Sequence, residues 1–302
     1  MKVLIIDIDS TIPNLALKKI EKYHLDLGDE VVWNLPLYRQ LADKVYVSCI
    51  FTKNKDRCFD YEDDPKCLIG GSGYDLKVEL PNEIEEVKPH INLGFTTRGC
   101  IRNCYFCIVP QKEGKVHIYN DIYDIWDGVS KEIILMDNNI LALPNHFKLI
   151  CQQLRKEKLK VDFNQGLDFR LLTENLWIEL KSLKHLQEKR FAFDDISYKE
   201  KVIEKLELMK KIGLKDWETR WYVYIGVNDT FKTVFERMEI LRSYKQGVYV
   251  MRDEKVYKNK EFMALACWGN CMGAFKLDLK DVLNNSKRLN VYKKYFESEG
   301  GY

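Results

Sequence analysis

The chain has 302 residues, of which 46% are hydrophobic and 31% are charged, and its 48 basic and 46 acidic residues leave a formal charge of +2. This composition predicts a globular protein with an ample core. The small net charge does not favour binding to nucleic acid or to a membrane surface. No run approaches the ~18 apolar residues of a membrane span. The N-terminal MKVLIIDID has the pattern of a buried strand and not of a signal peptide. The nine cysteines, an odd number, favour a reducing cytoplasm over a disulfide framework.

The first 85 residues alternate short strands with helices. Strands are predicted at residues 3–9, 30–33, 44–51 and 67–69. An amphipathic helix is expected to begin at Pro13 and to end before Gly28. Because such alternation builds parallel sheets covered by helices, residues 1–85 are predicted to form a small doubly wound α/β domain.

After a charged, proline-bounded linker that ends at Pro89, the pattern changes to longer βα repeats. Strands are predicted at residues 91–95, 132–136, 161–164, 190–193, 221–226 and 247–251, and helices at 147–159, 174–183, 199–212, 231–244 and 261–266. A TIM barrel would need eight such units, so the six predict an open partial barrel over residues 90–275. Residues 276–302 are expected to form a C-terminal helical tail, with a surface helix from Asn284.

Three cysteines share one short loop in the segment GFTTRGCIRNCYFCIVP. Cys100, Cys104 and Cys107 follow a C-x3-C-x2-C pattern. Thiolates this close in sequence can converge on one iron–sulfur cube, and a cube held by only three of them leaves one iron open to a small molecule. The alternative is a zinc site or a group of unligated thiols. A zinc site would need a fourth Cys or His, for which His117 is the nearby candidate.

With Phe106 directly before the last cysteine, this pattern resembles the signature of the radical S-adenosylmethionine (SAM) enzymes. The N-terminal region is similar to the cobalamin-binding or methylthiotransferase-type α/β domains that precede the radical domain in one branch. The resemblance implies that Cys100, Cys104 and Cys107 hold a [4Fe-4S] cluster whose open iron is chelated by SAM. An electron from the cluster would then cleave SAM to a 5′-deoxyadenosyl radical, which abstracts a hydrogen from substrate. An electron donor such as flavodoxin or ferredoxin is also implied.

Polar residues follow the predicted strands of the second region, and barrel sites form on the loops at the carboxyl ends of strands. These residues are Asp137, Asn138 and Asn139; Gln165, Gly166, Asp168 and Arg170; Asp194 and Asp195; Gly226, Asn228 and Asp229; and Arg252 and Asp253. For Asp168, Asp194 and Asp195, helix capping is an equal alternative to a role in the site, as it is for Thr173.

The resemblance assigns roles to five of these residues, with Phe106 as an apolar face beside them. Asp137 and Asn138 would orient the amino group of SAM, although the usual Gly-Gly-Glu is absent there. Gln165 and Arg170 would meet its ribose or carboxylate, since an Arg fork matches a carboxylate. Gly226, in YVYIGVND, would let the backbone pass close to adenine.

The sequence leaves open whether cobalamin and a second iron–sulfur cluster also bind. Branch members that ligate cobalt through an imidazole carry Asp-x-His-x-x-Gly, whereas here His24 stands in YHLDLG, so cobalamin is possible without a His ligand motif. Residues 70–73, GGSG with Ile69 before them, form either a plain turn or a backbone approach to a cobalamin tail. Cys49, Cys58 and Cys67 loosely resemble second-cluster cysteines. However, Cys49 is expected in the core, and the other two flank an acidic loop that is expected to be solvated.

Cys267 and Cys271 are four residues apart, so on a helix they would share a face and could hold a metal or take part in radical chemistry. Cys151 is expected in the core. The sequence therefore predicts a cytoplasmic radical SAM enzyme of unidentified substrate. Methyl or methylthio transfer to RNA or protein is one alternative, and a non-enzymatic metal-binding or redox module is another.

Overall fold

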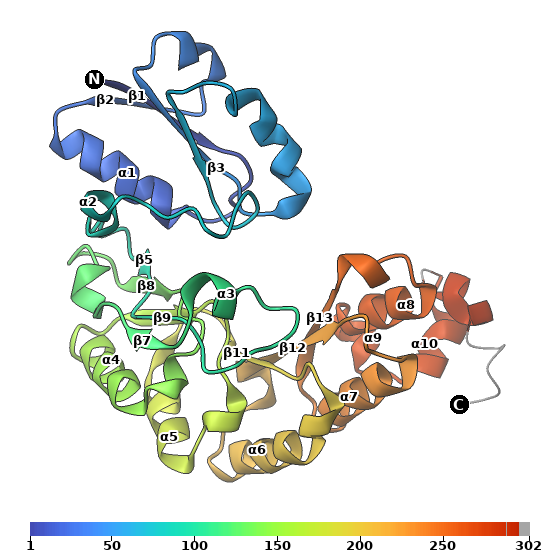
Figure 1. The fold of residues 1–302 in the computed structure, drawn as a ribbon. Helices are drawn as coiled ribbons and strands as arrows, with labels where there is room; N and C mark the ends of the chain where they lie inside the picture. The colour runs from blue at the N-terminus through green and yellow to red at the C-terminus, as the bar shows by residue number, and fades with distance from the viewer. Residues whose placement is uncertain (288, 296–302) are drawn as a thin grey trace.

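The structure is a computed structural model that describes residues 1–287 and 289–295. The chain forms two units, stacked one above the other in Figure 1. The N-terminal unit runs from β1 to α2, and the larger unit runs from β5 to the end of the described chain. Both are mixed α/β structures with parallel sheets.

The sheet of the N-terminal unit has four parallel strands in the order β2-β1-β3-β4. They are β1 (Lys2–Asp7), β2 (Glu30–Trp33), β3 (Lys44–Ser48) and β4 (Cys67–Gly70). Residues 3–6 of β1 are at most 5% exposed, so this strand is covered on both faces. Leu4 and Ile6 belong to an apolar cluster on one face, and Val3 and Ile5 to a second cluster on the other.

Side-chain caps set the limits of two of these elements. Asn14 accepts a hydrogen bond from Leu17 N (3.3 Å), so α1 (Leu15–Asp26) begins two residues after Pro13, where the helix was expected. β3 ends at Ser48 and not at Phe51, because the carboxylate of Asp9 accepts hydrogen bonds from the Ile50 and Phe51 amides (2.7 and 3.0 Å). Two 3-10 helices, η1 (Pro36–Gln40) and η2 (Thr52–Tyr61), complete this unit.

The larger unit contains two parallel sheets. One has the order β10-β9-β8-β5 and the other the order β11-β12-β13. The strands are β5 (Leu93–Gly94), β8 (Glu132–Leu135), β9 (Lys160–Phe163), β10 (Lys184–His185), β11 (Lys189–Ala192), β12 (Thr219–Ile225) and β13 (Gly247–Arg252). A parallel bridge between Leu167 and Phe191 joins the two sheets. All six predicted strands are present, and the fourth is preceded by β10, a short segment that pairs with the start of β9.

Helices cover one face of these sheets, on the outer side of the larger unit in Figure 1. They are α4 (Pro144–Lys156), α5 (Glu174–Ser182), α6 (Lys199–Lys211), α7 (Phe231–Ser243) and α8 (Lys260–Gly269), each within a few residues of its prediction. Their apolar sides form one core around the fully buried Trp177, Trp221 and Trp268. The opposite face, which we call the inner face, carries partly exposed side chains such as Arg220, Tyr222 and Tyr224.

The segment expected as a C-terminal tail adds to this core. α9 (Met272–Phe275) and α10 (Leu279–Asn285) follow α8, and Leu279, Val282 and Leu283 are buried in the same cluster as the strands. The surface helix expected from Asn284 is not formed as such, because α10 ends at Asn285 and a 3-10 helix, η9 (Asn290–Tyr295), follows. The remainder of that prediction lies outside the described residues.

A small antiparallel hairpin frames the cysteine loop, and sequence analysis missed it. β6 (Thr97–Arg98) pairs with β7 (His117–Ile118), and the chain between them contains the cysteines and α3 (Val109–Glu113). Strands of two residues are too short to show a periodic pattern.

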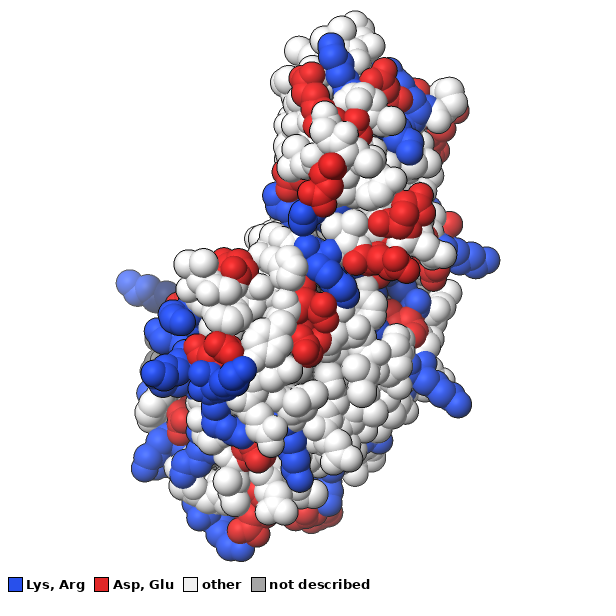
Figure 2. All heavy atoms as spheres, turned by 90° about the vertical axis from the view of Figure 1, so that its left-hand side faces the viewer, with Lys and Arg blue, Asp and Glu red and all other residues white. Residues whose placement is uncertain are grey.

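The junction between the two units is ordered, although its sequence was read as a linker. α2 (Asn82–Glu85) packs on α1 through Ile84, which is 2% exposed. Lys19 of α1 is also buried, donates a hydrogen bond to Tyr119 Oη (2.8 Å) in the larger unit, and pairs with Glu85 (3.1 Å). Figure 2 shows both units from the side, with basic and acidic side chains interspersed on that face. Among the described residues, no helix has the length and apolar character needed to cross a membrane.

Candidate active site

The cysteine loop is fixed at its start by Gly99 and Glu113. Gly99 has φ +77°, and a Cβ there would lie 2.4 Å from Lys115 O, so only glycine fits without a backbone shift. Its amide donates to Glu113 Oε2 (2.9 Å), and the Cys100 amide donates to Gly114 O (3.1 Å). Glu113 also pairs with Arg98 of β6 (3.0 Å), which ties the loop to the hairpin.

The three thiols of this loop are partly buried and lie within electrostatic range of one another. Burial raises the pKa of Cys104 and of Cys107, and the neighbouring cysteines raise it further. Cys100 Sγ accepts hydrogen bonds from the Arg102 amide (3.3 Å) and from Asn139 Nδ2 (3.4 Å). Such N–H donors stabilise a thiolate and tune a metal that it ligates.

Aromatic contacts hold the other end of the loop against β12. Phe106 stacks on Tyr224, with ring centroids 4.1 Å apart and planes at 27°. Tyr105 reaches Gly226, just beyond the end of β12, where a Cβ would lie 1.9 Å from the Tyr105 hydroxyl. The predicted role of Gly226 was close approach to adenine. In the structure, the group that approaches Gly226 is the loop's own tyrosine.

Asp137 follows β8 and is buried, at 3% exposed. Its Oδ1 accepts hydrogen bonds from the backbone and hydroxyl groups of Thr96 and Thr97, whereas Oδ2 has no partner. Burial raises the pKa of Asp137 to about 6, although those hydrogen bonds lower it. Asn138, predicted beside it, instead donates to Glu113 Oε2 (2.7 Å).

Asn139 lies in the same run of polar residues, but no role was predicted for it from the sequence. It is 3% exposed, its Nδ2 contacts Cys100 Sγ, and its Oδ1 has no hydrogen-bond partner. A buried polar atom without a partner costs free energy unless a ligand or water satisfies it. Asn139 Oδ1 and Asp137 Oδ2 are therefore two buried acceptors without a partner, and Asn139 lies against Cys100 of the cysteine loop. Only the polar run Asp137–Asn139 in the sequence gave a signal for this.

Asp168 joins the loop after β9 to the cysteine loop. It accepts from Arg102 Nε (2.8 Å) and from Arg170 Nε (2.6 Å), and these arginines hold the pKa of Asp168 below its usual range in spite of burial. Arg170 also lies over the Tyr198 ring (4.6 Å). Asp168 also caps a short 3-10 helix, so it is a helix cap as well as a contact of the cysteine loop. Gln165, predicted beside Arg170, is exposed.

The two aspartates after β11 differ. Asp195 caps a 3-10 helix, as Thr173 caps α5. Asp194 is not a cap: it accepts a hydrogen bond from the Tyr224 amide (2.9 Å), and burial raises its pKa to about 6. The fully buried Arg237 lies nearby and donates to Phe193 O and Tyr224 O (2.9 and 3.0 Å), which fixes the ends of β11 and β12.

These residues fit an iron–sulfur cluster with an adjoining ligand. Among the residues that the structure describes, no three His, Cys, Asp or Glu side chains are grouped as for a single metal ion. A cube spreads its thiolates over separate irons, so its ligands need not converge as closely as those of one ion. Three thiols from one loop, N–H donors to Cys100 and the unpartnered acceptor of Asn139 beside it are compatible with that arrangement.

The N-terminal unit offers no free imidazole to cobalt. His24 is 2% exposed, with Nδ1 hydrogen-bonded to Asp29 (2.7 Å) and Nε2 to Tyr46 (3.0 Å). The glycine turn after β4 packs on the backbone that follows β3: a Cβ at Gly71 would lie 2.3 Å from Cys49 O, and one at Gly73 would lie 2.5 Å from Phe51 C. This packing accounts for both glycines.

Of the remaining cysteines, Cys49 and Cys58 lie close together in one apolar cluster of the N-terminal unit, and the partly buried Cys67 packs against that cluster. Cys49, Cys58 and Cys151 are fully buried, so Cys58 is a core residue although it lies near an acidic loop, and burial raises the pKa of Cys49 to about 12. Cys267 is partly buried and packs against the main core, whereas Cys271 lies beyond the end of α8 and is exposed. The two therefore do not share a helix face as predicted.

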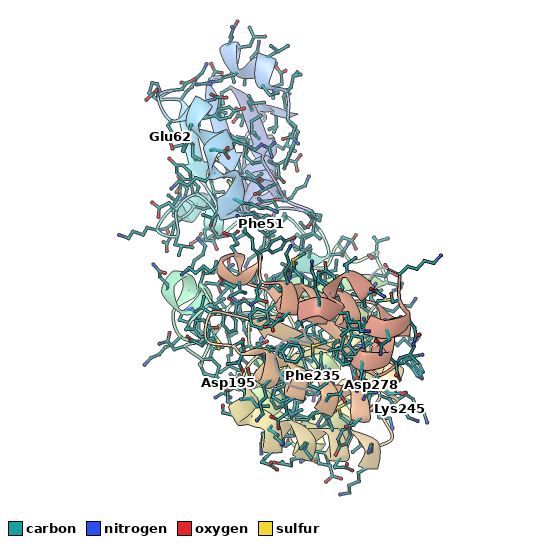
Figure 3. All side chains as sticks on the ribbon, turned by 90° about the vertical axis from the view of Figure 1, so that its right-hand side faces the viewer. Phe51, Glu62, Asp195, Phe235, Lys245 and Asp278 are labelled. Atoms are coloured by element: carbon teal, nitrogen blue, oxygen red, sulfur yellow. The ribbon has the colours of Figure 1, made fainter. Side chains whose placement is uncertain are left out.

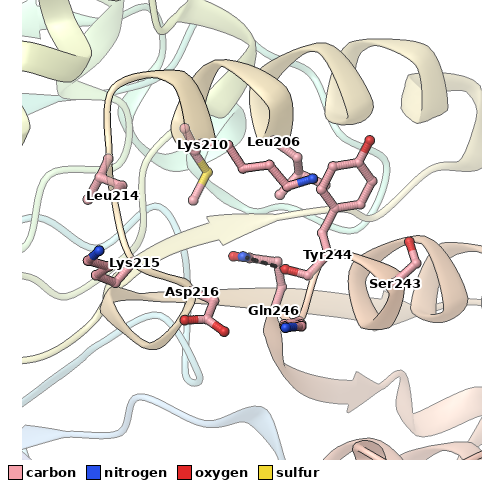
Figure 4. Close-up of a pocket in the computed structure, with 10 residues that line it drawn as sticks. Leu206, Lys210, Leu214, Lys215, Asp216, Ser243, Tyr244 and Gln246 are labelled. Carbon is pink, nitrogen blue, oxygen red and sulfur yellow. Dashed lines mark hydrogen bonds between the residues drawn. The ribbon is translucent and has the colours of Figure 1, made fainter.

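A pocket of about 370 Å³ lies elsewhere, between the C-terminal ends of α6 and α7 (Figure 4). It is lined by exposed lysines, among them Lys210, Lys215 and Lys245, together with Tyr244. This is the end of the larger unit at which β12 and β13 begin, opposite to the cysteine loop. No sequence-predicted site residue lines this pocket.

No protein-family model matches the chain. A curated relative, the tRNA-2-methylthio-N(6)-dimethylallyladenosine synthase of Flavobacterium psychrophilum, is 27% identical over 124 residues, which cover 31% of this chain and 26% of that protein. Two structures of the cobalamin-dependent S-adenosylmethionine radical enzyme OxsB resemble it, one with aqua-cobalamin and SAM bound and one with aqua-cobalamin bound. Their TM-scores are 0.52 and their identities 14% and 13%.

The OxsB structures match 97% of this chain but 56% of their own length, so the chain spans about half of OxsB. Its fold resembles that of OxsB, and it has an N-terminal α/β unit ahead of the unit that carries the cysteine loop. The resemblance identified from the cysteine pattern is thereby confirmed, and the partial match to a methylthiotransferase supports the same branch.

Proposed function

We propose that this chain is a radical SAM enzyme in which Cys100, Cys104 and Cys107 hold a [4Fe-4S] cluster. The observation that carries the proposal is the position of this C-x3-C-x2-C loop at the carboxyl ends of β8, β9 and β12, beside two buried acceptors without partners. When bound and reduced, the cluster supplies one electron that cleaves SAM to methionine and a 5′-deoxyadenosyl radical. The electron would come from a donor such as flavodoxin or ferredoxin.

The residues around the loop have separate roles in this proposal. Asp137 Oδ2 and Asn139 Oδ1 accept hydrogen bonds from the amino group of SAM, since both are buried and unsatisfied. Arg170 is held by Asp168 and has further N–H groups for a carboxylate or ribose. Phe106 keeps water from the cofactor, and Asn138 acts through Glu113 on the start of the loop. Of the five residues to which the resemblance assigned roles, Gln165 is the exposed one.

The architecture is part of the same proposal. The two joined parallel sheets with helices on one face would form an open (β/α) barrel over residues 90–275, and the N-terminal unit would be a separate domain. The apolar clusters of the N-terminal unit are distinct from the main core, which supports that division.

Methyl or methylthio transfer with bound cobalamin is the second candidate. The structures that resemble the chain contain aqua-cobalamin, and the curated relative carries out methylthio chemistry on tRNA. Phe51 lies on the side of the N-terminal unit that faces the larger unit (Figure 3), where it is 46% exposed. Because both nitrogens of His24 are engaged, cobalamin would have to bind here without that imidazole.

Anaerobic reconstitution tests the proposal. We expect four irons and four sulfides per chain, and release of 5′-deoxyadenosine from SAM when dithionite is added. Cys100→Ala should lose both, whereas the exposed Cys271→Ala, which controls for adventitious iron on a thiol, should keep both. One tightly bound zinc in place of iron would instead support a metal-binding module. A corrinoid spectrum retained after gel filtration with cobalamin would support the second candidate.

A further inference from the structure

Two layers of side chains lie on the inner face, below the cysteine loop. Alternate residues of β12 point to this face, and Tyr222 pairs in register with Tyr249 of β13. The two rings form a T-shaped pair, with centroids 6.0 Å apart and planes at 72°. Tyr249 is 50% exposed, so one ring of the pair is open to a ligand. We call Tyr222 and Tyr249 the tyrosine layer.

The second layer consists of two arginines, two residues nearer the start of the strands. Arg190 of β11 pairs in register with Arg220 of β12. Arg190 Nη1 contacts Asp162 Oδ1 (2.5 Å), and Arg220 Nη2 contacts Glu188 Oε1 (2.7 Å). We call Arg190 and Arg220 the arginine layer. Arg220 also contacts Val248 O through Nη1 (3.5 Å) and Met272 Sδ through Nη2 (3.4 Å). The carboxylates hold the guanidinium planes in position, and the N–H groups that remain on the two arginines are donors for an anion.

The spacing between the layers is set by the strand. Two residues of a strand rise ~7 Å, so the tyrosine layer lies about that far below Tyr224, and the arginine layer about as far below the tyrosines. Tyr224 is the residue on which Phe106 stacks. The inner face therefore presents, in order from the cysteine loop, a stacking platform and then a pair of anion donors.

We infer that the inner face binds a small phosphorylated substrate with a planar ring, of the mononucleotide class. The ring would stack on Tyr249, and the phosphate would accept from Arg190 and Arg220. This orientation leaves the ring as the part nearest the cysteine loop. A nucleic acid strand fits less well, because it carries phosphates on both sides of each base and the arginines lie on one side only. The inference rests on the proposed function and names its substrate class.

Binding to the full-length, cluster-loaded protein tests this inference without turnover. Each common nucleoside 5′-monophosphate would be titrated calorimetrically against its nucleoside, with saturating SAM present to fill any adenosine-binding site. We expect at least one monophosphate to bind ~10-fold or more tightly than its nucleoside, the gain typical of charge-assisted hydrogen bonds. Arg190→Gln should reduce that ratio below ~3-fold, whereas Tyr249→Ala should weaken both ligands alike.

Two outer residues provide matched controls. Arg155 on α4 also pairs with a glutamate, Glu179 (2.7 Å), and Tyr123 is a partly exposed tyrosine, so Arg155→Gln and Tyr123→Ala should change neither affinity. The inference is overturned if no monophosphate binds better than its nucleoside, or if a single-stranded RNA 12-mer binds where the monophosphates do not. Either result in a protein that still cleaves SAM would leave the proposed function standing, and loss of SAM cleavage would overturn that function instead.

Discussion

The ring of Phe106 stacks on the ring of Tyr224, with centroids 4.1 Å apart. Phe106 belongs to the cysteine loop, and Tyr224 lies at the carboxyl end of β12, more than a hundred residues later in the chain. Tyr224 is itself fixed by a hydrogen bond from its hydroxyl to Asp253. This contact fixes the position of the cysteine loop, which would hold the cluster, relative to the sheet that would bind the substrate.

Replacing Phe106 by alanine removes this stack. We expect the reconstituted Phe106→Ala variant to release 5′-deoxyadenosine ~10-fold or more slowly, because the cysteine loop loses the ring contact that fixes its position on β12. Its unfolding free energy should fall by ~1–3 kcal/mol, because the variant loses the aromatic pair and also the apolar area of a partly buried ring. Phe106→Tyr keeps the stack and should retain most of the activity. Equal rates in the alanine variant and the wild type would contradict the positioning role.

Gly226→Ala introduces a methyl group 1.9 Å from the Tyr105 hydroxyl and 2.8 Å from Tyr224 Cε1. Tyr105 must then move, so SAM cleavage should fall ~10-fold, in line with the rate cost of misplaced reacting groups. Adding Tyr105→Phe removes the closest atom and should restore part of the rate. Gly273→Ala is the control, since a Cβ there meets nothing within 4 Å. If the double variant is no better than Gly226→Ala, the clash with this hydroxyl is not the cause.

Lys19 links the two units, and its removal should weaken their association. Burial lowers the pKa of Lys19, while Glu85 opposes that effect and keeps the ammonium paired. Lys19→Met removes the ammonium that donates to Tyr119 and pairs with Glu85, and leaves only the hydrogen bond from the Tyr119 hydroxyl to Glu85. This loss should lower the unfolding free energy by ~1–3 kcal/mol in urea titrations. Lys22→Met on the same helix, which removes an exposed pair with Asp26, should cost less than ~0.5 kcal/mol. Equal costs in the two variants would count against the link.

His185 predicts a pH dependence of stability. Burial, and then the charge of Lys189, lower the pKa of His185 to about 4 from an ordinary 6.5. The unfolded chain therefore binds a proton between these values that the folded chain does not, so stability is full above pH 6.5 and is lost as the pH falls toward 4.

Urea unfolding of the wild type and of His185→Asn measures this contribution. Between pH 7.5 and 5 the wild type should lose ~2 kcal/mol more than the variant. Comparing the two proteins cancels the opposite slope from Asp137 and Asp194, whose raised pKa values favour the folded state in acid. Exposed His117→Asn should behave as the wild type. Parallel curves for the wild type and His185→Asn would refute the prediction.

Sequence patterns predicted the strands and helices well, because apolar runs such as residues 3–6 and the alternation in β12 are local consequences of burial. They could not predict that Asp137 Oδ1 would be used by Thr96 and Thr97, or that Asn139 and not Asn138 would face Cys100, because such pairings depend on distant parts of the chain. The cysteine pattern indicated the site but gave no information on the Glu113 and Asp168 contacts that hold it.

If three thiolates hold the cluster, one iron is free for SAM, and the electron paramagnetic resonance spectrum of the reduced protein reports on that iron. We expect a [4Fe-4S]⁺ signal whose g values shift when SAM is added, because SAM would ligate the open iron. A cluster signal that SAM leaves unchanged, or a full signal in Cys100→Ala, would contradict this expectation.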